Sequence, residues 1–245
     1  MRLLLLLPAL LLMVLAGGCT PDQLDLSREA EMAYVDLLFA LHHDQKEEAA
    51  IAADNLDFFL RQMHGKWPRP LKMEQLDNHL FHIGRAEWAY DDALESVEKG
   101  DLTLARVQLD RATYEFSVAA PAAFHELYIG EMYAFVTTWL EVEQAAGDQE
   151  LCSLNWDQFS QYAHDAKSLW KQDRYNRPDS RAYAMRPIDE ATFDKAHQGV
   201  QLELDAFIDI LKSGDQCHAR EKATAVSAAV WELVNLFGSR EGNAL

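Results

Sequence analysis

Apolar residues recur every three to four positions over most of the chain, which is the spacing that places them on one face of an α-helix. No alternating run of Val, Ile, Thr and Tyr reaches the length of a strand. The pattern therefore predicts an all-α protein. Its eight helices are expected at 27–43, 46–64, 72–99, 101–119, 121–146, 155–172, 189–213 and 216–237. In the third, one face is expected to carry most of the apolar residues: Leu76, Leu80, Ile83, Trp88, Leu94 and Val97.

The connections between these helices are of two kinds. Tight connections read EKGDLT (98–103), AAGDQELC (145–152) and KSGDQCHA (212–219). In each, Gly can take the left-handed conformation that ends one helix, and Asp can cap the next. HHDQKEE (42–48) holds the matching place in the first hairpin without a glycine. The long connections, 64–72 and 172–189, each carry two prolines, which a helix interior does not tolerate.

The order tight, long, tight occurs twice, on either side of Pro121, which marks either a kink or the start of a new helix. Aligning Gly100 with Gly214 brings apolar residues onto apolar residues, as with Leu94 and Ile208. Since short connections join antiparallel neighbours, this predicts two tandem antiparallel four-helix bundles. The bundles are expected at about 27–119 and 121–238, with a disordered tail at 239–245.

Two stretches permit a family comparison. YDDALESVEKGDLTLARVQLDRATYEF (90–116) resembles the hairpin of helices three and four in cytochrome b562-like four-helix bundles. That family binds haem between a first-helix methionine, whose place Met32 could take, and a histidine near the end of its fourth helix. Because residues 117–120 (SVAA) and 231–238 (WELVNLFG) contain no histidine, the resemblance implies the fold without the haem site. GDLTLAR (100–106) with Ala112 resembles part of a tetratricopeptide repeat, so a TPR-like α-solenoid is the alternative, although the period of about 34 residues is absent.

At the N-terminus, Arg2 precedes an apolar run from Leu3 to Leu15 that is broken only by Pro8. The run is shorter than the roughly 20 residues of a membrane-spanning helix and suits the core of a signal peptide. LAGGC (15–19) resembles the bacterial lipobox, although Ala16 stands where the family usually has Leu. The resemblance implies removal of 1–18, acylation of Cys19 with chains such as palmitate, and a short tether at 19–26.

An ordinary secretion signal cut near Ala16 or Gly18 is the alternative to a lipid anchor. In lipidated families an Asp directly after the cysteine tends to hold the protein at the inner membrane. Thr20 occupies this position, which favours an anchor in the outer membrane facing the periplasm over one in the inner membrane.

The chain is strongly acidic, with a formal net charge of −18, and removal of 1–18 with Arg2 would make it one unit more negative. This charge argues against binding nucleic acid or an anionic lipid surface, and it favours a cationic ligand or a basic partner.

With Cys19 assigned to lipid, Cys152 and Cys217 remain, and each follows a GDQ in a tight turn of the second predicted bundle. Both turns should lie at the same end of that bundle, so a disulfide is expected in an oxidising periplasm. Two independent thiols are the alternative.

Four histidines offer a candidate transition-metal site. His79 and His82 share a helix face, His64 closes the second predicted helix and His125 opens the fifth, both at the end where the third begins. Imidazoles from several bundle helices could converge on a metal, although the Glu-x-x-His pairs of di-iron bundles are missing. Solvent-facing or singly hydrogen-bonded histidines are the alternative.

The long connection after 172 concentrates arginine and tyrosine, which are favoured at protein interfaces. Its candidate partner-binding residues are Arg174, Tyr175, Arg177, Arg181, Tyr183 and Arg186. Alternatively, its arginines pair with acidic helix faces beneath the loop. Five tryptophans within helical patterns are expected in the core: Trp88, Trp139, Trp156, Trp170 and Trp231.

We find no nucleophile elbow, glycine-rich phosphate loop or zinc-protease motif, and we expect no enzyme activity. The sequence thus predicts a membrane-anchored periplasmic lipoprotein that acts as a non-enzymatic binding or scaffold protein for an envelope partner, without a cofactor. A metal- or haem-handling periplasmic protein is the alternative.

Overall fold

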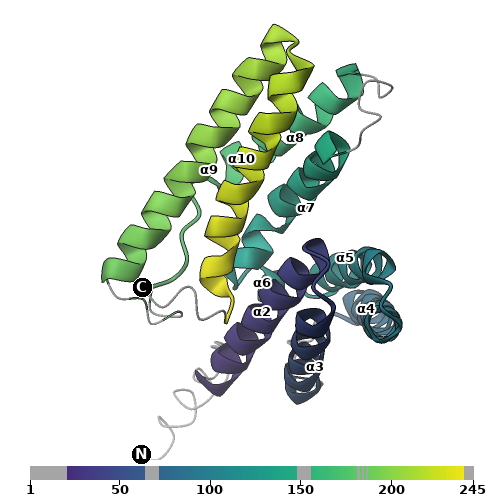
Figure 1. Cartoon of the computed structure of the whole chain (residues 1–245). Coiled ribbons are helices and arrows are strands. Elements are labelled where there is room, and N and C mark those ends of the chain that lie inside the picture. The colour runs from purple at the N-terminus through teal and green to yellow at the C-terminus, as the bar shows by residue number, and fades with distance from the viewer. Residues whose placement is uncertain are drawn as a thin grey trace, which may run out of the picture.

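The computed structural model describes residues 21–63, 72–147, 156–180, 183, 185 and 187–239. All regular elements in these ranges are helices, which confirms the all-α prediction. Four helix pairs follow one another along the chain (Figure 1). They are α2 (Pro21–His42) with α3 (Lys46–Met63), α4 (Met73–Lys99) with α5 (Leu102–Ala119), α7 (Tyr128–Gly147) with α8 (Trp156–Asp173), and α9 (Pro187–Ser213) with α10 (Gln216–Val234).

Two short elements complete the chain. The single turn α6 (Pro121–Phe124) precedes α7, and the 3-10 helix η2 (Asn235–Phe237) continues from α10. We refer to α2–α5 as the N-terminal half and to α6–η2 as the C-terminal half. No helix in the described ranges combines the length and the apolar content that crossing a membrane requires.

Two of the predicted tight turns form as expected. Gly100 and Gly214 both take the left-handed conformation, with φ of 78° and 71°. The next residue in each case caps the following helix: Asp101 accepts a hydrogen bond from the Leu104 backbone N–H, and Asp215 accepts one from that of His218. In the first hairpin, which lacks glycine, Asp44 takes the left-handed conformation itself with φ of 53°. Most of the third predicted turn lies outside the described residues.

The two halves repeat similar helix lengths. The α4–α5 pair has 27 and 18 residues, and the α9–α10 pair has 27 and 19. In the N-terminal half, α2 also packs on α5 and α3 on α4, while in the C-terminal half α7 packs on α10 and α8 on α9. The lengths and pairings agree with an internal duplication, whereas the division into two separate bundles stays a prediction.

Three boundaries differ from those expected. The first helix begins at Pro21 and includes most of the expected tether, consistent with the preference of proline for a helix start. The expected helix 121–146 is two helices, because Pro121 starts the single turn α6 and the chain turns again at 125–127 before α7. At the other end, the Ser239 backbone N–H donates to Asp36 Oδ1 at 3.1 Å, so the first residue of the expected disordered tail is bound to α2.

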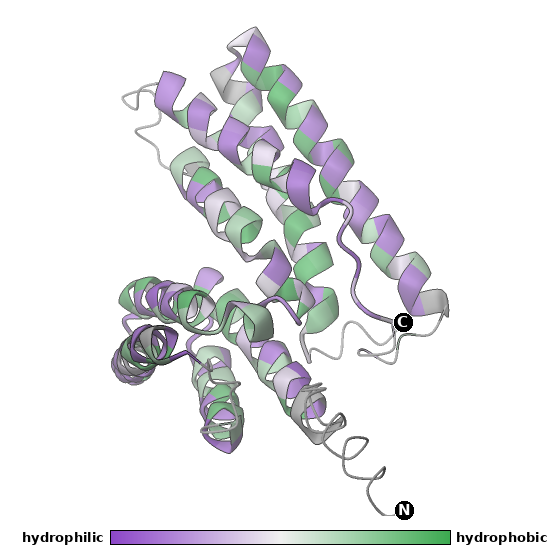
Figure 2. Ribbon diagram, turned by 180° about the vertical axis from the view of Figure 1, so that it is seen from behind, coloured by the Kyte–Doolittle hydropathy of each residue, from purple (hydrophilic) through white to green (hydrophobic). Residues whose placement is uncertain are grey.

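One hydrophobic core runs through both halves. Its largest fully buried side chains in the C-terminal half are Trp139, Trp170, Phe135 and Phe207. The core continues into α2, where Leu37 and Leu41 are fully buried, and buried residues of all four helix pairs belong to one cluster. Figure 2 shows apolar and polar residues interspersed along the helices, as expected for helices that bury one face and expose the other.

The buried face of α4 agrees with the prediction only in part, since Val97 is buried and Leu94 packs against the core. Trp88 is 66% exposed and Leu80 is 52% exposed, so the expectation that both are buried is wrong. Three alanines occupy the buried side of α4 instead: Ala86, Ala89 and Ala93. Small side chains such as these let α4 approach its neighbouring helices closely. The tryptophan prediction is confirmed for Trp139, Trp170 and Trp231, which are buried, and Trp156 is partly buried against the core.

The turn at Gly214 permits a clean test of its backbone conformation, because a methyl group added there would meet no atom within 4 Å. We expect Gly214→Ala to lower the free energy of unfolding by about 1 kcal/mol through the left-handed φ alone. Gly199, in α9, is the matched control with equally open space, and Gly199→Ala should raise stability by up to about 1 kcal/mol. Denaturant unfolding measures both, and shifts of the same sign would contradict this account.

Candidate ligand-binding cavity

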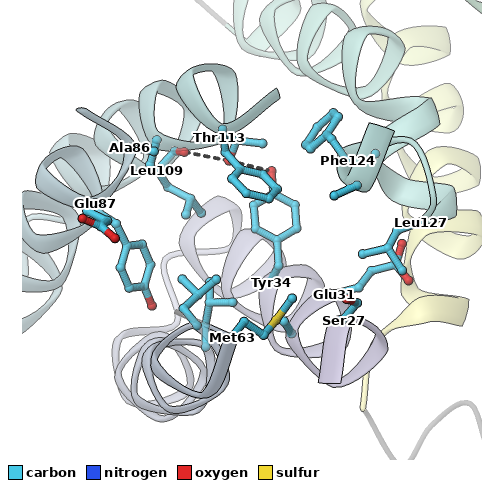
Figure 3. A pocket seen from close by; sticks show the side chains of 18 of the residues that line it. Ser27, Glu31, Tyr34, Met63, Ala86, Glu87, Leu109, Thr113, Phe124 and Leu127 are labelled. Carbon is cyan, nitrogen blue, oxygen red and sulfur yellow. Dashed lines mark hydrogen bonds between the residues drawn. The ribbon is translucent and has the colours of Figure 1, made fainter. Parts of the chain in front are cut away.

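A cavity of about 580 Å³ lies inside the N-terminal half, between the α2–α3 pair and the α4–α5 pair (Figure 3). The single turn α6 and the start of α7 close one end of it. Its volume falls within the roughly 300–1,000 Å³ of typical small-molecule sites. The cavity persists because alanines stand on three of its helices, where larger side chains would fill it: Ala30 on α2, Ala86 on α4 and Ala112 on α5.

The walls of the cavity are largely aromatic. Five rings line it: Tyr34, Tyr90, Phe116, Phe124 and Tyr133. Phe124 makes edge-on contacts with Phe116 and Tyr133, at ring-centroid distances of 6.1 and 5.5 Å. These contacts join α6 to its neighbours α5 and α7, so the aromatic wall has a defined shape.

The hydroxyl groups on these rings bind the protein's own atoms. Tyr90 donates to the Ala53 carbonyl at 2.9 Å, and Tyr133 donates to Asp110. Thr113 Oγ1 lies 3.4 Å from the Tyr34 hydroxyl, as the dashed line in Figure 3 shows. Burial raises the pKa of Tyr34 to about 12, so its hydroxyl stays protonated. The walls therefore present mainly the apolar parts of these side chains to the interior.

One carboxyl group stands at the closed end of the cavity. Glu31, on α2, is 5% exposed and lines the cavity. Its Oε1 accepts a hydrogen bond from the Ile129 backbone N–H at 2.8 Å, and its Oε2 accepts one from the Tyr183 hydroxyl at 2.6 Å. Burial raises the pKa of Glu31 to about 7, and the two hydrogen bonds oppose this rise.

Charged residues of α3 and α4 form the solvent-facing edge of the cavity. Arg61, on α3, contacts Asp57 one turn earlier with its Nε at 2.7 Å from Oδ2. Glu87 and Asp91 stand on α4 and are exposed. The edge is thus polar and mostly acidic, while the interior is apolar.

Gly130 fixes the closed end. A Cβ atom at this position would lie 1.8 Å from the Phe124 carbonyl oxygen, so only glycine allows α6 to fold back onto α7. The chain turns between the two helices. As a result, Phe124 lines the cavity while the Ile129 N–H donates to Glu31. The arrangement supplies shape, ring faces and one buried carboxyl, which are the components of a small-molecule binding site.

The chain matches no known protein family, no curated protein and no solved structure. Its function is therefore argued from its own residues.

The described histidines of the candidate metal site bind separate protein groups. His79 is buried and its Nδ1 lies 2.8 Å from the Ala119 carbonyl oxygen, and His82 Nδ1 lies 2.6 Å from Glu115 Oε2. His125 is exposed beside Phe124, and His64 lies outside the described residues. Within the described part of the chain, no group of three or more His, Cys, Asp and Glu side chains could hold a metal ion. The metal hypothesis gains no support from these three positions.

The described side chains of the Arg/Tyr loop contact the protein itself. Arg177 lies 3.1 Å from Asp194 on α9, and the Arg174 guanidinium lies over the Tyr175 ring. Tyr183 reaches Glu31 and also accepts a hydrogen bond from the Tyr128 backbone N–H. Arg181 and Arg186 lie outside the described residues. The contacts of Arg177 follow the alternative in which loop arginines pair with acidic helices, although Tyr175 is 73% exposed.

The cysteine predictions cannot be followed in the structure. Cys19 and Cys152 lie outside the described residues, as does the side chain of Cys217 in α10.

The sequence analysis missed Glu31 and the aromatic walls. A signal for Glu31 is present, because it stands between Ser27 and Tyr34 at helical spacing, on the side of α2 that carries Val35 and Leu38. An acid on an otherwise apolar helix face is either paired or functional, since burying a charge costs free energy.

The raised pKa of Glu31 predicts a pH effect on stability. Between 4.5, its ordinary pKa, and about 7, the folded protein holds a proton that the unfolded chain has released. The stabilisation by this proton is complete below pH 4.5 and is lost as the pH rises through about 7. Glu31→Gln cannot ionise, so it should gain about 3 kcal/mol relative to wild type between about pH 4.5 and about pH 7.5.

Denaturant unfolding of both proteins at the two pH values measures this gain. Burial lowers the pKa of His42 and of His197, and these shifts make stability rise with pH instead. Because both histidines are present in wild type and in the variant, their effects cancel in the difference. Glu48→Gln, on the exposed side of α3, is the control and should show no such change. A difference between Glu31→Gln and wild type that is constant with pH would contradict the prediction.

Proposed function

We propose that this protein is a non-enzymatic binding protein that holds a small, mostly apolar ligand in the cavity of its N-terminal half. The observation that carries the proposal is a space of about 580 Å³ lined by aromatic and aliphatic side chains, with a single buried carboxyl at its closed end. Apolar atoms that line a space open to solvent face water and lack packing contacts, which costs stability. A ligand would supply those contacts.

We further propose that the protein is anchored in the outer membrane through acylated Cys19 and faces the periplasm. The lipobox-like LAGGC (15–19) supports this anchor. The position of Cys19 in the chain also relates the anchor to the cavity. Cys19 stands two residues before α2, the helix that carries Ser27 and Glu31 of the cavity lining. An anchor at this point would hold the cavity near the membrane surface, where molecules with an apolar part concentrate.

A role in binding an envelope protein through the Arg/Tyr loop stays a prediction with less support. Tyr183 and Arg177 bind α2 and α9 of the same chain, although the side chains of Arg177 and Tyr175 are both exposed. The loop thus supports the cavity through the hydrogen bond that the Tyr183 hydroxyl donates to Glu31. The binding of a small ligand is the function that the geometry favours.

Ligand binding can be tested with a neutral apolar dye. We expect N-phenylnaphthylamine to bind saturably, with one dye molecule per chain and enhanced fluorescence, because the cavity is apolar and aromatic. Ala112→Phe places a ring in the cavity and should weaken binding by about tenfold, or about 1.4 kcal/mol. Circular dichroism checks that the variant keeps its helix content.

The matched control is Ala191→Phe, which adds the same ring on the exposed side of α9, outside the cavity. It should bind the dye as wild type does. Equal weakening in both variants, or no saturable binding by wild type, would count against a ligand cavity.

The anchor can be tested by fractionating cells that make the full chain. The protein should sediment with the outer membrane, and its mature N-terminus should be Cys19 with the mass of attached acyl chains. Cys19→Ser should release it into the soluble fraction, whereas Cys217→Ser should leave it in the membrane. An unmodified N-terminus would overturn this proposal without affecting the cavity.

A further inference from the structure

The chemistry of the cavity also indicates which class of ligand it takes. Among the described side chains of the N-terminal half, two glutamates are buried, and they differ in their partners. Glu115 lies 2.6 Å from His82 Nδ1 and 2.7 Å from Arg85 Nε, so basic groups balance its charge. Glu31 has two neutral partners, the Ile129 N–H and the Tyr183 O–H, and no basic side chain pairs with it among the described residues.

An unbalanced buried carboxyl beside an empty space is unusual, because buried charges are ordinarily paired. Glu31 lines the cavity, and Figure 3 places it between Ser27 and Leu127 at the closed end. A group entering the cavity can therefore reach the carboxyl that the protein itself leaves without a counter-charge.

The remaining charged residues of the lining are mostly acidic. Asp57, Glu87 and Asp91 are acidic, and Arg61, the basic residue of the described lining, contacts Asp57. The net charge of −18 adds a favourable long-range field for cations. A negatively charged ligand would have to pass these acids and then lie near Glu31.

The site also lacks the usual means of holding an anion. A helix N-terminus can bind an anion through its free N–H groups, and the start of α7 faces the cavity. However, the Ile129 N–H in its first turn already donates to Glu31. The aromatic walls act in the same direction, since ring faces attract cations and not anions.

We propose that the cavity binds a cationic amphiphile, with an amine or quaternary ammonium head beside Glu31 and its apolar part against the rings of Tyr34, Phe116 and Phe124. The inference rests on the proposed function, which requires only that the cavity bind an apolar molecule. It adds the charge of the head group and the residue that recognises it.

Three ligands with the same alkyl chain separate the two claims: decyltrimethylammonium, decanol and decyl sulfate. Calorimetric titration of the purified protein at about pH 8, above the pKa of Glu31, keeps its carboxyl ionised, and the quaternary head is charged at every pH. Concentrations stay below those at which micelles form. We expect the cation to bind at least about tenfold more tightly than decanol, and the sulfate to bind more weakly than decanol.

Glu31→Gln should lose the preference for the cation, measured within the variant as the ratio of its affinities for decyltrimethylammonium and decanol. Glu48→Gln removes the same charge from the exposed surface of α3 and should keep that preference. If Glu31→Gln does not fold, the order of the three ligands on wild type still decides the question, and Glu31→Asp tests the position with the charge retained.

Each result has a definite meaning. Equal binding of the three ligands, or tighter binding of the sulfate, overturns the inference and leaves the cavity function standing. A cation preference that survives in Glu31→Gln overturns the assignment of the head group to Glu31. If decanol does not bind either, the proposed function itself fails.

Discussion

The carboxyl group of Glu31 joins three segments that are far apart in the sequence: α2, the first turn of α7 and the loop before α9. A buried carboxyl requires hydrogen-bond donors, and few positions of the surrounding backbone can supply them with good geometry. Satisfying Glu31 therefore fixes where Ile129 and Tyr183 lie relative to α2. Because Ile129 lies one residue from Gly130, the same requirement sets the position of α6 and with it the closed end of the cavity.

The two halves use similar helices and fill their interiors differently. In the C-terminal half, the large rings of Trp139, Trp170, Phe135 and Phe207 are fully buried, and the Trp139 and Trp170 N–H groups donate to Ser227 and Gln201. In the N-terminal half, alanines occupy interior positions of α2, α4 and α5, and aromatic rings surround the remaining space without filling it. Similar helices thus surround large buried rings in the C-terminal half and a cavity in the N-terminal half. The volume of the interior side chains accounts for this difference.

Local rules predicted much of this structure from the sequence. The eight main helices follow from apolar spacing, and the turns at Gly100 and Gly214 follow from glycine and aspartate at adjacent positions. The buried face of α4 followed only in part: Val97 is buried, but Leu80 and Trp88 are exposed. Apolar residues surround this helix, and their spacing does not say which of them the neighbouring helices cover. The cavity could not be predicted for a related reason. It depends on distances between helices and on the absence of side-chain volume, and neither leaves a periodic trace in the sequence. Glu31 is the exception, since an acid within an apolar stripe can be recognised from residue spacing alone.

The single core that runs through both halves has a thermodynamic consequence. Contacts such as that of Phe39 on α2 with Trp231 on α10, at a ring-centroid distance of 5.2 Å, mean that neither half can lose its packing without exposing apolar surface of the other. A molecule that binds the cavity of the native protein and not the unfolded chain therefore shifts the folding equilibrium of the whole chain by mass action. Occupancy of one half would slow local opening, measured by amide hydrogen exchange, in helices of the other half that the ligand never touches.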